Sequence, residues 1–180
     1  MQNNEGVPFI HKAIRTVEGA KRALRAGAGA FVVSTHGGRV LDQCRATAEV
    51  RPAIADAVGG KMTIFVDGGI RTGMDVFKAL ALGADAVLIA RPFVTMVYGG
   101  GAEGVQIYVD KLTAELKDTM AMCGAHSLKE INPSMLFSKG PPLQKDAPPN
   151  LRSGFLQDCL FRLLLHPVGG GEVGGSVGPI

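Results

Sequence analysis

An internal repeat is the feature that most constrains the fold of this chain. The tripeptide Ile-Arg-Thr at residues 14–16 returns 56 positions later at residues 70–72. The pattern Ala-Leu followed by Gly-Ala-x-Ala, at residues 23–30, returns at the same offset at residues 79–86. Two strand–helix units fit inside one offset, so each unit takes about half of it. This is the unit length of (β/α)8 barrels, in which eight units need about 250 residues.

Short apolar runs alternate with helical patterns along the chain. We expect strands at residues 8–14, 30–34, 62–66 and 86–89, and helices at residues 17–26, 47–58, 75–82 and 103–122. Strands that alternate with helices over short connections predict a parallel α/β sheet. Pro52 falls inside the second expected helix and predicts a later start or a kink. Because four units are visible, the expected fold is half of a (β/α)8 TIM barrel, with two open strand edges.

Composition excludes several classes of protein. A chain of 180 residues with 46% hydrophobic residues suits one domain with a real core. A net charge of +3 without a dense Lys/Arg run argues against a nucleic-acid partner. The three cysteines, Cys44, Cys123 and Cys159, have neither CxxC nor metal-ligand spacing. The amino terminus lacks a signal pattern and no 18 apolar residues run together, so we expect a cytoplasmic protein without a membrane partner or a metal.

A polar turn follows the second expected strand. The apolar run at residues 31–34 leads into Thr-His-Gly-Gly-Arg, which places His36 and Arg39 at the carboxyl end of a parallel strand. Histidine is the commonest general base near neutral pH, and arginine binds a carboxylate with two hydrogen bonds. The pair suits removal of a proton from a small carboxylate-bearing substrate. The alternative is a strand cap at His36 with a solvent-facing Arg39.

A glycine turn, Asp-Gly-Gly-Ile-Arg-Thr-Gly at residues 67–73, follows the third expected strand. The two glycines let backbone N–H groups approach a ligand closely, and the helix that begins a few residues later turns its positive end toward it. Arg71 and Arg91, after the third and fourth strands, add bidentate contacts to an anion. The turn therefore predicts a phosphate site. The alternative is a turn required only for packing, with both arginines in surface ion pairs.

Four stretches resemble the carboxyl-terminal half of the FMN-dependent α-hydroxy acid dehydrogenase and oxidase family. They are KAIRTVEGAKRALRAGAGAFVVSTHGGRVLD, IFVDGGIRTGMDVFKALALGADAVLIARP, YGGGAEGV and MCGAHSLKEI, and the similarity covers about residues 8–136. The family includes glycolate oxidase, lactate oxidase and lactate monooxygenase. The resemblance implies FMN as cofactor and oxidation of a small L-2-hydroxy acid, of the lactate or glycolate type, to the 2-oxo acid.

The resemblance also implies roles for individual residues. His36 would take the substrate's proton as a hydride equivalent passes to flavin N5, and Arg39 would hold the substrate carboxylate. Lys12, which without the resemblance is a strand-end lysine in water, would lie beside flavin N1 and the C2 carbonyl. Ser34 would hydrogen-bond the isoalloxazine ring. The ribityl chain and phosphate would be held by Asp67, Gly68, Gly69, Ile70, Arg71, Ala90 and Arg91.

The chain departs from the family pattern in three residues and in extent. Thr35 replaces the usual Asn, and Ala13 and Ala90 replace glycines. The family's amino-terminal half has no counterpart here, so we expect a homo-oligomer or a complementary half as partner. The alternative function is a truncated, non-catalytic flavin- or phosphate-binding remnant. Residues 1–136 form the expected domain, and residues 137–180 form a Gly/Pro-rich, low-complexity tail.

Overall fold

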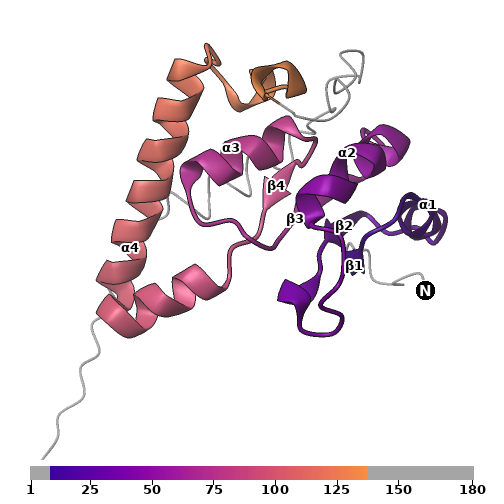
Figure 1. The fold of residues 1–180 in the computed structure, drawn as a ribbon, viewed down its shortest axis with the longest axis horizontal. Helices are drawn as coiled ribbons and strands as arrows, with labels where there is room; N and C mark the ends of the chain where they lie inside the picture. Colours follow the sequence, from indigo (N-terminus) through magenta and orange to yellow (C-terminus); the bar gives the residue numbers. More distant parts are fainter. Residues whose placement is uncertain (1–8, 138–180) are drawn as a thin grey trace, which may run out of the picture.

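The computed structural model describes residues 9–137, which contain a four-stranded parallel sheet (Figure 1). The strands are β1 (Ile10–Ile14), β2 (Ala30–Val33), β3 (Thr63–Val66) and β4 (Ala86–Val87), in the order β1-β2-β3-β4. Strand order therefore follows chain order, and the predicted parallel α/β sheet is confirmed. The predicted tail lies outside the described residues, apart from Phe137.

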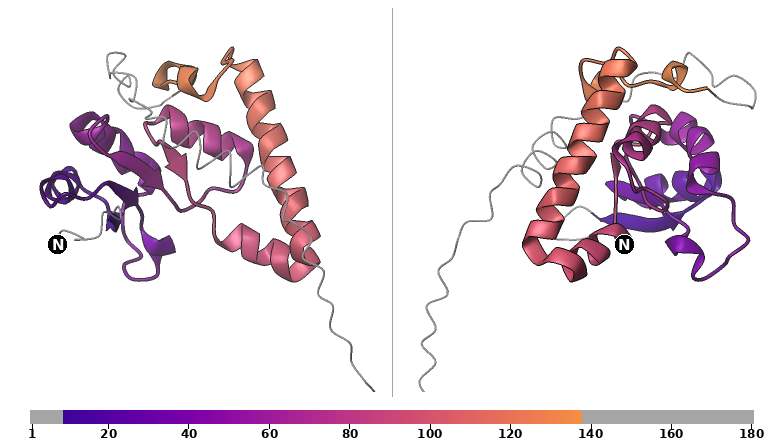
Figure 2. Two further views of the ribbon diagram at one scale, coloured as in Figure 1. Left: turned by 180° about the vertical axis from the view of Figure 1, so that it is seen from behind. Right: turned by 60° about the vertical axis from the view of Figure 1, so that its left-hand side comes forward.

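A helix follows each strand, and the first helix packs against the second and the third against the fourth (Figures 1 and 2). The helices are α1 (Val17–Arg25), α2 (Thr47–Val58), α3 (Gly73–Ala81) and α4 (Arg91–Met122). Three short 3-10 turns complete the described chain: η1 (His36–Gly38), η2 (Leu128–Glu130) and η3 (Pro133–Met135). No described helix is both long enough and apolar enough to cross a membrane.

The sequence repeat corresponds to two helices that each begin with an N-cap threonine. Thr16 caps α1 by accepting a hydrogen bond from the Gly19 N–H at 3.0 Å. Thr72 caps α3 in the same way, and the Asp75 carboxylate completes a capping box by accepting from the Thr72 N–H. A side-chain oxygen at this position satisfies N–H groups that have no partner inside the helix. The repeat thus marks equivalent strand–helix units.

Two apolar clusters hold the elements together. The first lies between the sheet and the first two helices, and its buried residues include Ala20, Phe31, Val33, Ile54 and Ile64. The second joins α3 to the end of α4 and the turns that follow, and it contains Phe77, Leu80, Ala81, Ala125 and Ile131. Leu116 and Met120, on the predicted apolar face of α4, pack against this second cluster.

The expected helix at residues 47–58 is confirmed, but the later start suggested by Pro52 and the expected start of the last helix near residue 103 are wrong. Helix α2 starts at Thr47 and runs through Pro52. The proline has no N–H, so the Ala48 carbonyl loses its hydrogen bond within the helix. Ala48 is exposed, so water can bond this carbonyl instead. Helix α4 starts at Arg91 rather than near Glu103. Pro92 fits the first turn of a helix, where its missing N–H costs nothing. Two glycines, Gly100 and Gly101, interrupt the helical backbone, and Figure 1 shows the bend between its two pieces.

Strand β1 forms one edge of the sheet and is largely exposed. Its first four residues face solvent, and only Ile14 is buried. Strand β4 forms the other edge, and its neighbour Leu88 is 43% exposed. Within residues 9–137 neither edge strand has a second partner. A parallel sheet is normally covered on both faces and edges, so these edges are available for further strands.

Candidate active site

Three side chains from three neighbouring strands meet at the carboxyl edge of the sheet. Lys12 of β1 donates from Nζ to Ser34 Oγ at 3.0 Å and to Asp67 Oδ2 at 2.5 Å. Ser34 directly follows β2, and Asp67 directly follows β3. The Lys12 side chain is 47% exposed, whereas that of Asp67 is 19% exposed. The Lys12 ammonium group is therefore accessible to solvent, and the less exposed Asp67 carboxylate holds it in place.

Ser34 connects this group to the turn that contains His36. Its Oγ accepts hydrogen bonds from Lys12 Nζ and from the His36 N–H, the latter at 3.0 Å. These two bonds use both lone pairs of the hydroxyl and leave its proton free to be donated. Ser34 is completely buried, so it orients Lys12 and His36 from behind. The predicted hydrogen bond from Ser34 to a flavin ring stays a prediction.

The backbone at residues 36–38 presents the imidazole at the surface. His36, Gly37 and Gly38 have φ values of 53°, 67° and 73°, three consecutive left-handed residues. Two of them are glycines, which adopt this conformation without steric cost. The side chains of His36 and Arg39 are exposed. Ser34, which bonds both Lys12 Nζ and the His36 N–H, holds this turn at the same edge of the sheet as Lys12.

The loop after β3 leaves room for a ligand. Gly68 and Gly69 have φ values of 87° and 80°, and no atom lies within 4 Å of the place where a Cβ on Gly69 would be. The Thr47 hydroxyl donates to the Asp67 carbonyl at 3.1 Å and so fixes the start of this loop to α2. Successive backbone N–H groups in such a turn are suited to anions. The loop is thus open and rigidly attached, as a phosphate or ribityl site requires.

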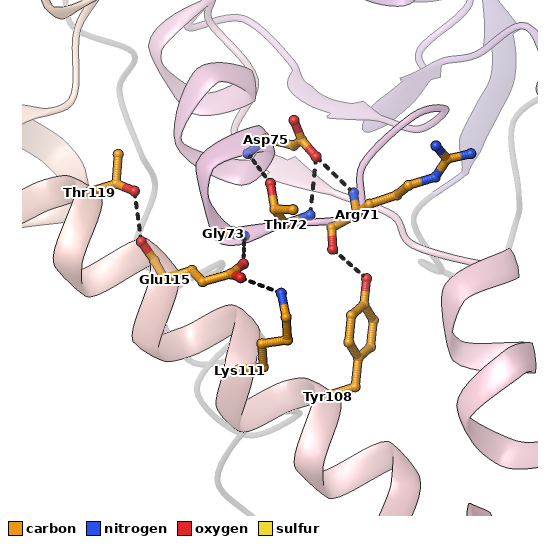
Figure 3. Close-up of polar contacts among 8 residues, drawn as sticks. All are labelled: Arg71, Thr72, Gly73, Asp75, Tyr108, Lys111, Glu115 and Thr119. Atoms are coloured by element: carbon orange, nitrogen blue, oxygen red, sulfur yellow. Dashed lines mark hydrogen bonds and ion pairs between the residues drawn. The ribbon is translucent and has the colours of Figure 1, made fainter. Parts of the chain in front are cut away.

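The first turn of α3 is already occupied by the chain's own carboxylates (Figure 3). Asp75 Oδ2 accepts from the N–H groups of Arg71 and Thr72, both at 3.1 Å. The Glu115 carboxylate, from α4, accepts from the Gly73 N–H at 2.8 Å. These three N–H groups therefore already have acceptors within the chain. The loop glycines and the arginine side chains remain as the possible phosphate ligands.

Helix α4 braces the turn that contains Arg71 (Figure 3). The Tyr108 hydroxyl donates to the Arg71 carbonyl at 2.8 Å, and Glu115 pairs with Lys111 as well as with the Gly73 N–H. The Lys111 hydrogen bond, followed by that from Gly73, lowers the pKa of Glu115. Burial raises the pKa of Tyr108, so its phenol stays protonated and remains a donor at neutral pH. Main-chain movement at Arg71 is restrained from both sides.

The two arginines reach the sheet edge from different elements. A Cβ on Gly37 would lie 3.2 Å from Nη2 of Arg91, so this guanidinium lies against the His36 turn. Arg71 is exposed, and within the described part of the chain neither guanidinium has an acidic partner. Ala90 has a φ of −114°, so its methyl group causes no backbone strain where the family has glycine. The donor set, two free guanidinium groups beside an open glycine loop, fits a phosphate.

Ala13 is a strained position beside this site. Its φ is 71°, in the left-handed region that disfavours a side chain with a Cβ. The register between β1 and β2 shifts between Lys12 and Ile14, so Ala13 forms a bulge. The bulge redirects the strand directly after Lys12.

The sequence predicted that the residues at the ends of β1, β2 and β3 lie at one edge of the sheet. It did not predict the residues whose hydrogen bonds hold these turns in place. Asp75 has a detectable signal, because Thr72 and an acidic residue three positions later form the capping-box pattern. Thr47, Tyr108 and Glu115 have no such signal, since their roles depend on packing between distant elements. Among the described residues no group of histidine, cysteine or acidic side chains is arranged to hold a metal ion.

Comparison with known proteins places this chain in a family. A model described as FMN-dependent dehydrogenase matches residues 1–138, so the chain belongs to the FMN-dependent dehydrogenase family. Members of this group are FMN-dependent α-hydroxy acid oxidoreductases. An L-lactate dehydrogenase of Acinetobacter baumannii is 46% identical over 129 residues, which are 72% of this chain and 34% of that protein. An L-lactate dehydrogenase of Xanthomonas campestris is 46% identical over 125 residues, which are 69% of this chain and 32% of that protein.

Solved structures of related enzymes share the fold of this chain. Mandelate oxidase with benzoyl-formic acid matches with a TM-score of 0.69 and 43% identity, over 71% of this chain and 38% of that one. The predicted fold class is confirmed, since the four strand–helix units match part of a TIM barrel. A structure of a mandelate oxidase variant contains an FMN adduct. The chain spans about a third of the length of the curated relatives it matches.

Proposed function

We propose that this chain forms the FMN- and substrate-binding half of an enzyme that oxidises a small L-2-hydroxy acid to the 2-oxo acid. The relatives named L-lactate dehydrogenase and the mandelate oxidases support a 2-hydroxy acid as substrate. When bound, FMN accepts the two electrons of the oxidation. The residues of this chain bind the cofactor, orient the substrate and accept its proton.

The Arg91 guanidinium beside Gly37 is the observation that most supports this proposal. The proposed phosphate ligands follow β3 and β4, whereas His36 lies in the turn after β2. Arg91 connects these two regions of the sheet edge. Arg91, one of the proposed phosphate ligands, therefore lies against the turn that presents the imidazole. Lys12 lies on the opposite side of the same turn, one strand further along the sheet.

Each residue then has a defined task. Arg71 and Arg91 bind the phosphate with charge-assisted hydrogen bonds, together with the backbone at Asp67, Gly68, Gly69, Ile70 and Ala90. Lys12, held by Asp67 and Ser34, places a positive charge beside the flavin ring. Arg39 holds the substrate carboxylate. The His36 imidazole would accept one proton of the substrate, and bound FMN would supply the acceptor for the hydride equivalent that leaves with the electron pair.

Reduction of the bound flavin tests the assignment. The full chain is loaded with FMN and titrated with L-lactate or glycolate without oxygen, and the loss of the visible flavin band is followed. We expect bleaching in the wild type and none in His36→Ala, with flavin still bound. The control His126→Ala removes an exposed imidazole beyond α4 and is expected to bleach normally. Equal bleaching of His36→Ala would show that the base is another group.

The exposed edge strands favour a second candidate, a half-barrel that binds FMN but needs a partner for activity. Ile10, His11 and Lys12 of β1 are exposed, and the sheet is open beyond β4. The partner is either a second copy of this chain or a complementary half that supplies further strands. Flavin-loaded protein that does not bleach alone, yet elutes as a monomer in size-exclusion chromatography, supports this candidate over the active enzyme.

A further inference from the structure

A pocket lies between α2, α3 and the end of α4, and His36 is not among the residues that line it. Its volume is about 1030 Å³, at the upper end of the range for small-molecule sites. Apolar side chains form much of its wall, among them Pro52 of α2, Phe77 of α3, Met122 of α4 and Leu136 after η3. At one end it reaches residues 68–70, and at the other it reaches Cys123.

The wall of this pocket contains a buried cation. Arg51 of α2 is only 2% exposed, and its Nε has no hydrogen-bond partner. Burial lowers the pKa of Arg51 to about 10, so the group is still charged at neutral pH. A buried charge without a partner is strongly destabilising, and native proteins normally pair it. The pocket is where a compensating anion can reach it.

The acidic residues of the pocket do not compensate this charge. Glu49 lies two positions before Arg51 on the same helix, and residues at that spacing point in different directions. Asp75 directs Oδ2 at the backbone of Arg71 and Thr72. Lys78 also lines the pocket and adds a second positive charge. The described part of the chain therefore offers a largely apolar cavity whose wall contains a guanidinium with an unpartnered Nε.

We propose that this pocket binds an organic monoanion, a carboxylate with an apolar body, whose charged group pairs with Arg51. A planar guanidinium matches a carboxylate with two parallel hydrogen bonds, and the apolar wall accommodates the rest of the ligand. Arg51 is not one of the proposed cofactor residues, and the pocket meets those residues only at positions 68–70.

A matched pair of fluorescent probes tests the proposal on the full chain. 1-Anilinonaphthalene-8-sulfonate has an apolar body and one negative charge, and N-phenyl-1-naphthylamine has the same body without the charge. We expect Arg51→Met to raise the Kd of the charged probe at least tenfold and to leave the Kd of the neutral probe unchanged. Decanoate, a carboxylate with an apolar chain, is expected to displace the charged probe from the wild type.

Two controls separate binding from changes in folding. Arg22→Met removes an exposed arginine of α1 and is expected to bind the charged probe like the wild type. Arg51→Met is expected to melt at a higher temperature than the wild type, because it removes a buried unpaired charge. The proposal is overturned if Arg51→Met binds the charged probe as tightly as the wild type. It is also overturned if the wild type shows no saturable binding that decanoate reverses.

Discussion

Lys12 Nζ lies 2.5 Å from Asp67 Oδ2, although the two residues are 55 positions apart in the chain. Strand β2 separates their strands, and Ser34 at its end bonds the same amine at 3.0 Å. These two bonds connect the ends of β1, β2 and β3, and the Lys12 ammonium group remains partly exposed at the edge of the sheet. In the proposed enzyme this charge stabilises the reduced flavin.

Lys12→Met is therefore expected to lower the reduction potential of bound FMN. Loss of an interaction worth about 1.4 kcal/mol corresponds to about 30 mV for a two-electron couple. The free energy of unfolding should change by less than about 1 kcal/mol, because the pair is partly exposed. Lys21→Met, on the exposed side of α1, is the matched control. An unchanged potential would place Lys12 away from the flavin ring.

Ala13→Gly is expected to stabilise the chain. A left-handed φ of 71° costs an alanine about 1 kcal/mol, and glycine avoids that cost. Chemical denaturation should show a higher free energy of unfolding for the variant. Ala53→Gly, at an exposed position inside α2, should lower it by about 1 kcal/mol. Destabilisation by both substitutions would contradict the assigned backbone conformation of Ala13.

Tyr108→Phe tests the brace between α4 and the Arg71 turn. The variant loses one hydrogen bond worth about 1 kcal/mol but keeps the ring that packs edge-on against Phe93. We expect the Kd for FMN to rise about fivefold and the Kd for riboflavin, which lacks the phosphate, to stay constant. Tyr98→Phe, at a position 89% exposed, is the control. Equal weakening of both flavins would mean that the brace does not act through the phosphate site.

Asp75→Ala tests the capping box of α3 through its pH dependence. Burial alone would raise the pKa of Asp75, but the hydrogen bonds from Arg71 and Thr72 outweigh it and the pKa is lowered. The stabilisation is therefore fully present above the unfolded pKa of about 3.9 and is lost as the pH falls through the lower folded value. At pH 7 the variant should be about 1 kcal/mol less stable.

The difference between Asp75→Ala and the wild type should shrink as the pH falls below about 4. Asp56→Ala, which removes an exposed carboxylate of α2 outside the capping box, is the matched control. Unfolding curves recorded between neutral and acidic pH make the comparison. A constant difference for Asp75→Ala would mean that its ionised carboxylate does not cap the helix.

Local patterns explain why much of the fold could be predicted from the sequence. Thr16 and Thr72 stand at the same place in each repeat, and both cap helices. His36 and Arg71 follow apolar strands, and parallel pairing of Val33 with Val66 brings their turns to one edge. These features depend on spacing within a few residues, which the sequence displays directly.

Other features depend on packing between distant elements and could not be predicted. The bonds from Tyr108 and Glu115 to the β3–α3 turn require the position of α4, which bends at Gly100 and Gly101. The burial of Arg51 depends on how α2 meets α3 and the end of α4. An arginine between Val50 and Pro52 gives no sign that its charge will be buried without a partner.

Flavin titration tests the central claim, that one edge of this sheet gathers a phosphate site and the His36 turn around a flavin. The quenching of flavin fluorescence is measured as FMN or riboflavin is titrated with the full chain. We predict that FMN binds at least tenfold more tightly than riboflavin, and that Arg71→Gln or Arg91→Gln removes most of this preference. Equal affinity for both flavins, or no saturable quenching by the wild type, would contradict the account.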